Sequence, residues 1–446
     1  MVAMTPPRNG AVRRDRRRAP AADIAQSSRV GQAQPRAFHE SRRSAKQRTM
    51  KDVSTLVARQ YEAFAYPEPF TDLVEEVGKG YFQIGDPSLY GPVLWPRGRP
   101  DRQLRILVAG CGTVQAAYAA HSNPDDEVVG IDLSEASLAH ERYLQDKHSL
   151  KNLKLFQGDL LEVGSIGGAF DIILCTGVLH HMADPAAGLA ALREVLAPDG
   201  VMVLMLYGAT VRTGVYMLQD AFRRMGIAQS ADGVARVRNI LGELPGRHYA
   251  QDYIRAAEEL KHDTAVVDTF LHPQDRAYTV PQLLELVEGA GLQFQNWVDN
   301  NLYWRNGAWG PDSAVAASVD TLPPREHWAA VEMLRQAAGV HFFTVRHGAE
   351  EVATVDFEQG EWRQFVPHRA PGLSKTGETS FRRGPYELNC PDLEAFVIDG
   401  IDGVRTISEI VNVAALEEIP TSERDEFARR YFEHLWKLGH VMIALP

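Results

Sequence analysis

The sequence has few cysteines and no long apolar run, and both absences exclude classes of protein. Three cysteines among 446 residues cannot build a disulfide scaffold, which favours a reducing, cytoplasmic location. The longest apolar run, Val201 to Tyr207, is far shorter than the roughly 20 residues that a membrane span needs. We also find no internal repeat and no spacing typical of metal ligands. These absences predict a globular protein that neither crosses a membrane nor holds a metal.

The net charge of −11 is unevenly distributed along the chain. Residues 1–50 carry twelve Lys or Arg against three acidic residues and show hardly any apolar periodicity. Such a segment cannot bury enough surface to order itself, so we expect a disordered basic tail. The alternatives are a nucleic-acid arm, a transit peptide, or a start codon assigned too early, with Met50 opening the protein. The acidic remainder argues against nucleic acid as a partner.

One stretch, from Leu104 to Asp132, organises the rest of the chain. Leu104–Ala109 predicts a buried strand, and Gly110-Cys111-Gly112 after it suits a tight turn that a ligand can approach closely. Thr113 is placed to cap the next helix, whose free N–H groups would favour an anionic ligand group. A second strand is expected at Val128–Ile131, and Asp132 follows it directly. An acidic residue about 20 positions after such a glycine turn can bind ribose hydroxyls. The stretch therefore predicts a nucleoside-cofactor site.

Strands and helices alternate after this stretch, which predicts an α/β fold with a doubly wound parallel sheet. Further strands are expected at 153–156, 170–175, 201–207, 293–298 and 340–345. The last two lie close together in sequence, which suggests an antiparallel edge. We expect four parts: the tail 1–50, a helical cap and linker 51–103, the cofactor domain 104–350 with a helical insertion or lid 211–280, and an accessory module 351–446. Three helices and a strand make that module winged-helix-like.

Five motifs in order resemble the class I S-adenosylmethionine-dependent methyltransferases. They are Ala109–Thr113, Gly130–Ser134, Gly158–Leu160, Phe170–Ile173 with Val178–His181, and Leu192–Leu196 with Pro198–Gly200. The resemblance implies a seven-stranded Rossmann-like sheet and S-adenosyl-L-methionine as cofactor. It also implies that Asp132 holds the ribose and that Asp159 contacts the adenine. The implied cofactor-binding residues are Gly110, Cys111, Gly112, Thr113, Asp132, Leu133, Asp159, Leu160 and Thr176.

The chain departs from this family at two positions. Val108 stands where an acid commonly helps to hold the methionine ammonium, and Val114 replaces the last glycine of the turn. Gln115, Tyr61 or Tyr66 could supply replacement polar contacts. The departures motivate one alternative, a non-catalytic cofactor-binding protein. The Rossmann-like start motivates another, a nicotinamide-dependent oxidoreductase, which does not account for the Gly158–Leu160 motif.

A methyltransferase mainly aligns donor and acceptor, and a general base can remove the acceptor's proton. His180 and His181 follow the fourth strand and are the candidate bases; being adjacent, they point apart. His272, Arg276 and Tyr278 lie in the segment expected to cover the acceptor, with a salt-bridged surface loop as the alternative. We expect a small-molecule acceptor, with a protein or peptide as the alternative. The sequence does not indicate an oligomeric state.

Overall fold

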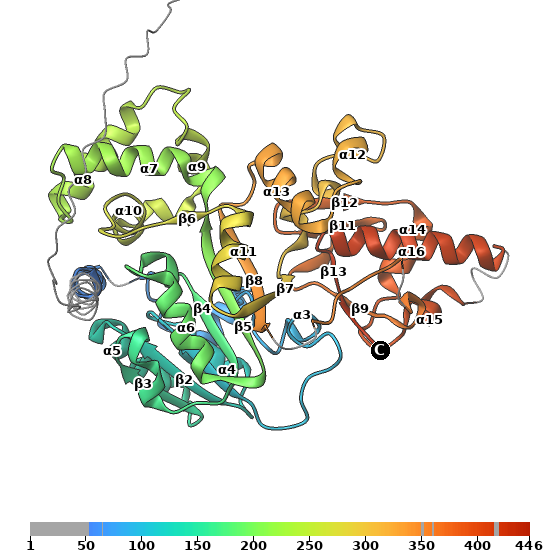
Figure 1. The fold of residues 1–446 in the computed structure, drawn as a ribbon, viewed down its shortest axis with the longest axis horizontal. Coiled ribbons are helices and arrows are strands. Elements are labelled where there is room, and N and C mark those ends of the chain that lie inside the picture. Colours follow the sequence, from blue (N-terminus) through green and yellow to red (C-terminus); the bar gives the residue numbers. More distant parts are fainter. Residues whose placement is uncertain (1–52, 65, 349–351, 359–360, 414–418) are drawn as a thin grey trace, which may run out of the picture. The chain divides into compact units, whose positions relative to one another are not determined.

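The computed structural model describes residues 53–64, 66–348, 352–358, 361–413 and 419–446 (Figure 1). The basic tail expected at residues 1–50 lies outside these ranges. No helix within them is both long and apolar enough to cross a membrane.

A mixed sheet with the strand order β3-β2-β1-β4-β5-β8-β7 forms the centre of the fold. The parallel strands are β1 (Arg105–Ala109), β2 (Glu127–Asp132), β3 (Leu153–Gln157), β4 (Phe170–Thr176) and β5 (Leu196–Gly208). The strand β8 (Val340–His347) runs antiparallel between β5 and β7 (Leu292–Trp297), and β6 (Ala277–Tyr278) adds a short pairing to β5. The doubly wound, seven-stranded prediction is therefore confirmed, and so is the antiparallel edge, which β8 and β7 form.

Two layers of helices cover the two faces of this sheet. One face packs against α4 (Gln115–Ser122) and α5 (Glu135–His148), the other against α6 (Pro185–Val195) and α11 (Val280–Gly289). Side chains of β1 alternate between the two cores, with Ile106 in one and Leu107 in the other. Since a strand buried on both faces needs apolar residues at every position, this alternation explains the continuous apolar runs in the sequence.

The predicted insertion is helical and has a core of its own. It comprises α7 (Ala209–Arg224), α8 (Ala231–Glu243), α9 (Gln251–Ala256) and α10 (Asp263–Phe270), which gather at one end of the strands (Figure 1). The N-terminal helix at residues 53–63 is followed by Phe64, which packs against this core. Other helices are α2 (Leu73–Gly78), α3 (Gly91–Leu94), α12 (Ala314–Val319) and α13 (Pro324–Arg335).

The C-terminal residues form a second hydrophobic core. Its helices are α14 (Asp392–Asp399), α15 (Ile407–Val411) and α16 (Thr421–Lys437), followed by β13 (Val441–Ala444), close to the predicted bounds. The stretch before these helices also contains short strands. It contains β9 (Val366–Arg369), which pairs with β13, and the sheet β10 (Leu373–Lys375), β11 (Ser380–Arg383) and β12 (Tyr386–Asn389). Strands of three or four residues are too short to show a periodicity.

Candidate active site

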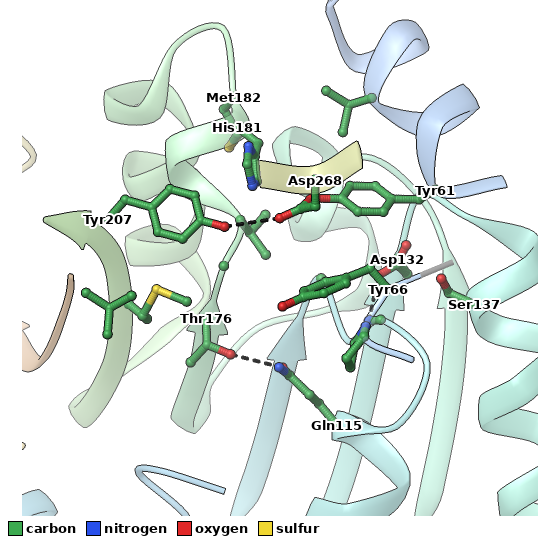
Figure 2. Close-up of a pocket in the computed structure, with 18 of the residues that line it drawn as sticks. Tyr61, Tyr66, Gln115, Asp132, Ser137, Thr176, His181, Met182, Tyr207 and Asp268 are labelled. Atoms are coloured by element: carbon green, nitrogen blue, oxygen red, sulfur yellow. Dashed lines mark hydrogen bonds between the residues drawn. The ribbon is translucent and has the colours of Figure 1, made fainter. Parts of the chain in front are cut away.

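A cavity of about 590 Å³ lies at the C-terminal ends of β1, β2, β4 and β5 (Figure 2). Open α/β sheets bind their ligands at this edge. Most of its lining comes from the glycine turn with the strand ends, the N-terminal helix with Tyr66 and Pro67, and the helical insertion, and residues 337–342 add to it. The cavity has the size of a small-molecule site.

The glycine turn is held under the segment Tyr66-Pro67, which we call the strap. Gly112 has a φ of +57°, and a Cβ atom there would lie 2.9 Å from the Tyr66 carbonyl oxygen. Thr113 does not cap α4, as the sequence suggested; its hydroxyl donates to the Pro67 carbonyl at 2.7 Å. That carbonyl comes from 46 positions away, so local sequence could not reveal the competing partner. α4 instead begins after Val114, without a side-chain cap.

The N-terminus of α4 is already occupied by a side chain. Glu141 of α5 accepts hydrogen bonds from the backbone N–H groups of Ala116 and Ala117, at 2.9 and 2.8 Å. Burial raises the pKa of Glu141 to about 8. The expectation that this helix end receives an anionic ligand group was therefore wrong, because a protein carboxyl satisfies its donors. A dinucleotide would place its pyrophosphate there, so this arrangement counts against the nicotinamide alternative.

The half of the cavity nearest β2 and β3 matches the predicted cofactor residues. Asp132 accepts hydrogen bonds from the N–H groups of Gly112, at 2.8 Å, and Ser134, at 2.9 Å. Each carboxylate oxygen keeps a second lone pair for a ribose hydroxyl. Burial raises the pKa of Asp132. Seven of the nine residues predicted from the resemblance line the cavity: Gly110, Gly112, Asp132, Leu133, Asp159, Leu160 and Thr176. Cys111 and Thr113 are fully buried and are not part of the lining.

The residues that could replace the missing family acid also reach the cavity. Val108 is fully buried in β1, whereas Gln115, Tyr61 and Tyr66 line the cavity wall. The Thr176 hydroxyl donates to Oε1 of Gln115 at 3.0 Å. This bond orients the Gln115 amide and leaves its Nε2 as a donor.

The other half of the cavity is built around Asp268 of α10. Its Oδ1 accepts from the Tyr61 hydroxyl at 3.0 Å and its Oδ2 from the Tyr207 hydroxyl at 3.2 Å (Figure 2). The Gln60 amide lies 3.4 Å from Oδ1. Burial, and then the charge of Asp268, raise the pKa of Tyr61 and Tyr207 well above the ordinary value, so both hydroxyls keep their protons and donate.

Of the two candidate bases, only His181 lines the cavity. Its Nδ1 lies 3.0 Å from the Gln274 carbonyl oxygen, to which it donates, so Nε2 carries a lone pair. His180 is completely buried, stacks on Tyr207 with ring centroids 3.8 Å apart, and has no partner at either ring nitrogen. Burial lowers the pKa of His180 well below its ordinary value. The structure therefore offers His181, and not His180, to an acceptor.

None of the three predicted substrate residues, His272, Arg276 and Tyr278, is part of the cavity lining. His272 is buried and stacks on His181 at 3.8 Å, while Arg276 is exposed and, like Tyr278, is not part of the lining. His181, Asp268 and His272 bring ligand atoms within 4.8 Å of one another. However, the Gln274 N–H donates to Nδ1 of His272 at 3.1 Å, so Nε2 of His272 carries the proton and cannot coordinate a metal.

A buried cation completes this half of the site. Arg212 of α7 pairs with Asp275 at 3.1 Å and donates to the Tyr253 hydroxyl at 3.2 Å. Its guanidinium lies 3.7 Å from the centre of the Tyr207 ring, on which it stacks. The positive charge of Arg212 is thus balanced by Asp275 and not by Asp268.

Sequence reasoning missed Tyr207, Arg212, Tyr253 and Asp268. Only Asp268 had a local signal, because it is the single acid in the apolar run of the helix that ends at Phe270. A carboxylate amid buried apolar positions is rare unless it has partners.

Comparisons with known proteins agree with this geometry. Residues 107–202 match the family model of a methyltransferase domain. The chain is 32% identical over 297 residues to an uncharacterized protein of Synechococcus, covering 63% of this chain and 69% of that one. It is 33% identical over 132 residues to the trans-aconitate 2-methyltransferase of Deinococcus radiodurans, covering 27% of this chain and about half (48%) of the length of that enzyme.

A solved structure shares most of the fold. PKMT2 from Rickettsia typhi superposes with a TM-score of 0.63 over 85% of this chain and 77% of that chain, at 15% identity, and it has also been solved in complex with AdoHcy. The cavity lining includes the carboxylate of Asp132 and two apolar residues, Leu133 and Leu160. The chain belongs to the class I S-adenosylmethionine-dependent methyltransferases and has S-adenosylmethionine as its cofactor.

Proposed function

We propose that the protein moves the methyl group of S-adenosylmethionine to a small-molecule acceptor, with His181 as the general base. One observation carries this proposal: the cofactor residues around Asp132 and the cluster of His181 and Asp268 line one continuous cavity. Two kinds of relative support a small acceptor by name, a trans-aconitate 2-methyltransferase and ubiquinone biosynthesis O-methyltransferases.

The chain's own residues position the reactants. The sulfonium of the bound cofactor supplies an electrophilic methyl group. Asp132 would hold the ribose hydroxyls, and the strap fixes the glycine turn through the Thr113–Pro67 hydrogen bond. His181 takes the acceptor's proton at Nε2, because its Nδ1–H is fixed to the Gln274 carbonyl. Such orientation is the main contribution that an enzyme makes to a displacement of this kind.

Two measurements on the full chain test the proposal. Calorimetric titration with S-adenosylmethionine and S-adenosylhomocysteine should show binding that Asp132→Asn weakens at least about tenfold, since bonds to a charged group are lost. Asp146→Asn removes an exposed carboxylate from α5 and should leave binding unchanged.

Formation of S-adenosylhomocysteine is then followed in the small-molecule and protein fractions of a cell extract. Turnover with the small-molecule fraction that His181→Gln lowers by about 100-fold supports the proposal. Binding without turnover in either fraction would favour a non-catalytic protein, and turnover with the protein fraction alone would make the acceptor a protein.

A further inference from the structure

Asp268 is a buried carboxylate whose partners are all neutral. It is 4% exposed, and it accepts hydrogen bonds from two tyrosine hydroxyls and one amide. Within the described ranges it forms no ion pair, and the buried cation Arg212 is paired with Asp275 instead. An ionised carboxylate out of water is costly unless a positive charge or several donors compensate it.

The remaining walls around Asp268 are aromatic. Tyr61 and Tyr66 line the cavity, and in Figure 2 the Tyr61 ring is drawn beside the carboxylate and the Tyr66 ring below it. Aromatic faces attract cations through the ring quadrupole, and they do so more strongly away from water. Both faces of Tyr207 are taken, by Arg212 and by His180, so this residue presents its hydroxyl. A negative charge enclosed by tyrosines is suited to a small organic cation.

This cation site is separate from the place expected for the methionine end of the cofactor. That end is expected over the glycine turn and the Thr176–Gln115 pair. In the view of Figure 2, the Tyr66 ring is drawn between that pair and Asp268. The carboxylate instead lies beside the His181 and His272 rings, with ligand atoms within 4.8 Å of one another. Asp268 therefore faces the acceptor side of the cavity.

We infer that the acceptor is a primary or secondary amine that enters as an ammonium ion bound by Asp268. This inference rests on the proposed methyl transfer and names its substrate class. The ammonium N–H groups occupy the lone pairs of Asp268 that the tyrosine hydroxyls leave open. A neutral alcohol would leave the buried carboxylate without a countercharge, and a carboxylate acceptor would meet a like charge.

The reaction balances in two steps. The ammonium group gives one proton to Nε2 of His181, which leaves a neutral amine with a lone pair and an imidazolium. The lone pair then forms the N–C bond to the methyl carbon as the S–C bond breaks, so the positive charge of the sulfonium passes to the product nitrogen. His181 returns its proton to water after the product leaves. Since His181 lies beside Asp268, the carboxylate faces a positive charge throughout.

Three isosteric probes test the inference without knowledge of the natural acceptor. n-Butylamine, n-butanol and butyrate are titrated into the full chain saturated with S-adenosylhomocysteine. We expect the amine to bind at least about tenfold more tightly than the alcohol, which corresponds to one hydrogen bond to a charged group. Equal binding of the alcohol, or tighter binding of butyrate, would overturn the inference.

Two matched variants then assign the effect to Asp268. Asp268→Asn should remove the preference for the amine while the affinity for S-adenosylhomocysteine stays within about twofold. Asp263→Asn makes the same change on the same helix at a side chain that is 62% exposed, and it should keep the preference. If Asp268→Asn weakens the binding of S-adenosylhomocysteine as much as the binding of n-butylamine, the carboxylate contributes to the cofactor site and the inference fails. If S-adenosylhomocysteine does not bind the wild type, the proposed function fails instead.

Discussion

The contact between the strap and the glycine turn gives a sharp prediction for Gly112→Ala. At a φ of +57° an alanine is strained by about 1 kcal/mol, a cost that any left-handed position would carry. In addition, the new Cβ would lie 2.9 Å from the Tyr66 carbonyl oxygen and 3.2 Å from Cδ of Pro67. Backbone atoms cannot yield to such a contact as a flexible side chain can, so the strap must move away from the turn.

Displacement of the strap should weaken cofactor binding as well as stability. Tyr66 lines the cavity, and the Gly112 N–H donates to Asp132 at 2.8 Å. Loss of one bond to a charged group corresponds to a fall in affinity of at least about tenfold. Calorimetric titration with S-adenosylhomocysteine measures this affinity, and thermal unfolding measures the stability.

Gly226→Ala is the matched control for this change. Gly226 has a φ of +64°, and a Cβ there would meet no atom within 4 Å. It should lose the same ~1 kcal/mol of stability and keep its cofactor affinity. If Gly112→Ala binds like Gly226→Ala, the strap does not shape the site and the reasoning is refuted.

Three further predictions concern the histidines and the buried ion pair. His181→Gln should lower turnover by about 100-fold, as is typical for loss of a general base, while the cofactor affinity measured by calorimetry stays unchanged. Full turnover of this variant would exclude His181 as the base. Burial lowers the pKa of His341 to about 4. The unfolded chain therefore binds a proton that the folded chain does not, and stability is lost as pH falls from about 6.5 towards 4, by about 2 kcal/mol at pH 5. Urea unfolding at pH 7.5 and 5 should show a smaller loss for His341→Gln, and an equal loss would contradict this account. Arg212→Leu should lower the free energy of unfolding by about 3–5 kcal/mol, because it leaves Asp275 charged and without its ion-pair partner. Adding Asp275→Leu should restore part of this stability, as measured by thermal unfolding. If the effects of the two substitutions are simply additive, the ion pair does not stabilise the fold.

The cofactor half of the site could be read from sequence, because each of its signals is local. A strand, a glycine turn and an acid at the end of the next strand occur within about 30 residues of one another, and the parallel sheet then brings them together. The parallel direction of the first five strands follows from the same alternation of strands and helices.

The acceptor half could not be read in this way, because distant segments form it. Tyr61 and Asp268 are 207 positions apart, and only the packing of the insertion against the N-terminal helix brings them into contact. The adjacent histidines illustrate the limit. Their adjacency predicts that they point apart, and this was wrong: in the short 3₁₀ turn at Leu179–His181 their ring centroids lie 4.3 Å apart, and only His181 lines the cavity.

The position of β8 also has a consequence for biosynthesis. On the ribosome β5 is finished at Gly208, but the strand that covers its edge begins only at Val340. At roughly 5–20 residues per second, this delay is on the order of ten seconds. During that time the apolar strand presents an open row of N–H and C=O groups, which is a template for aggregation. The nascent chain therefore depends on its helical insertion, or on a chaperone, to shield this edge until the last strand of the sheet arrives.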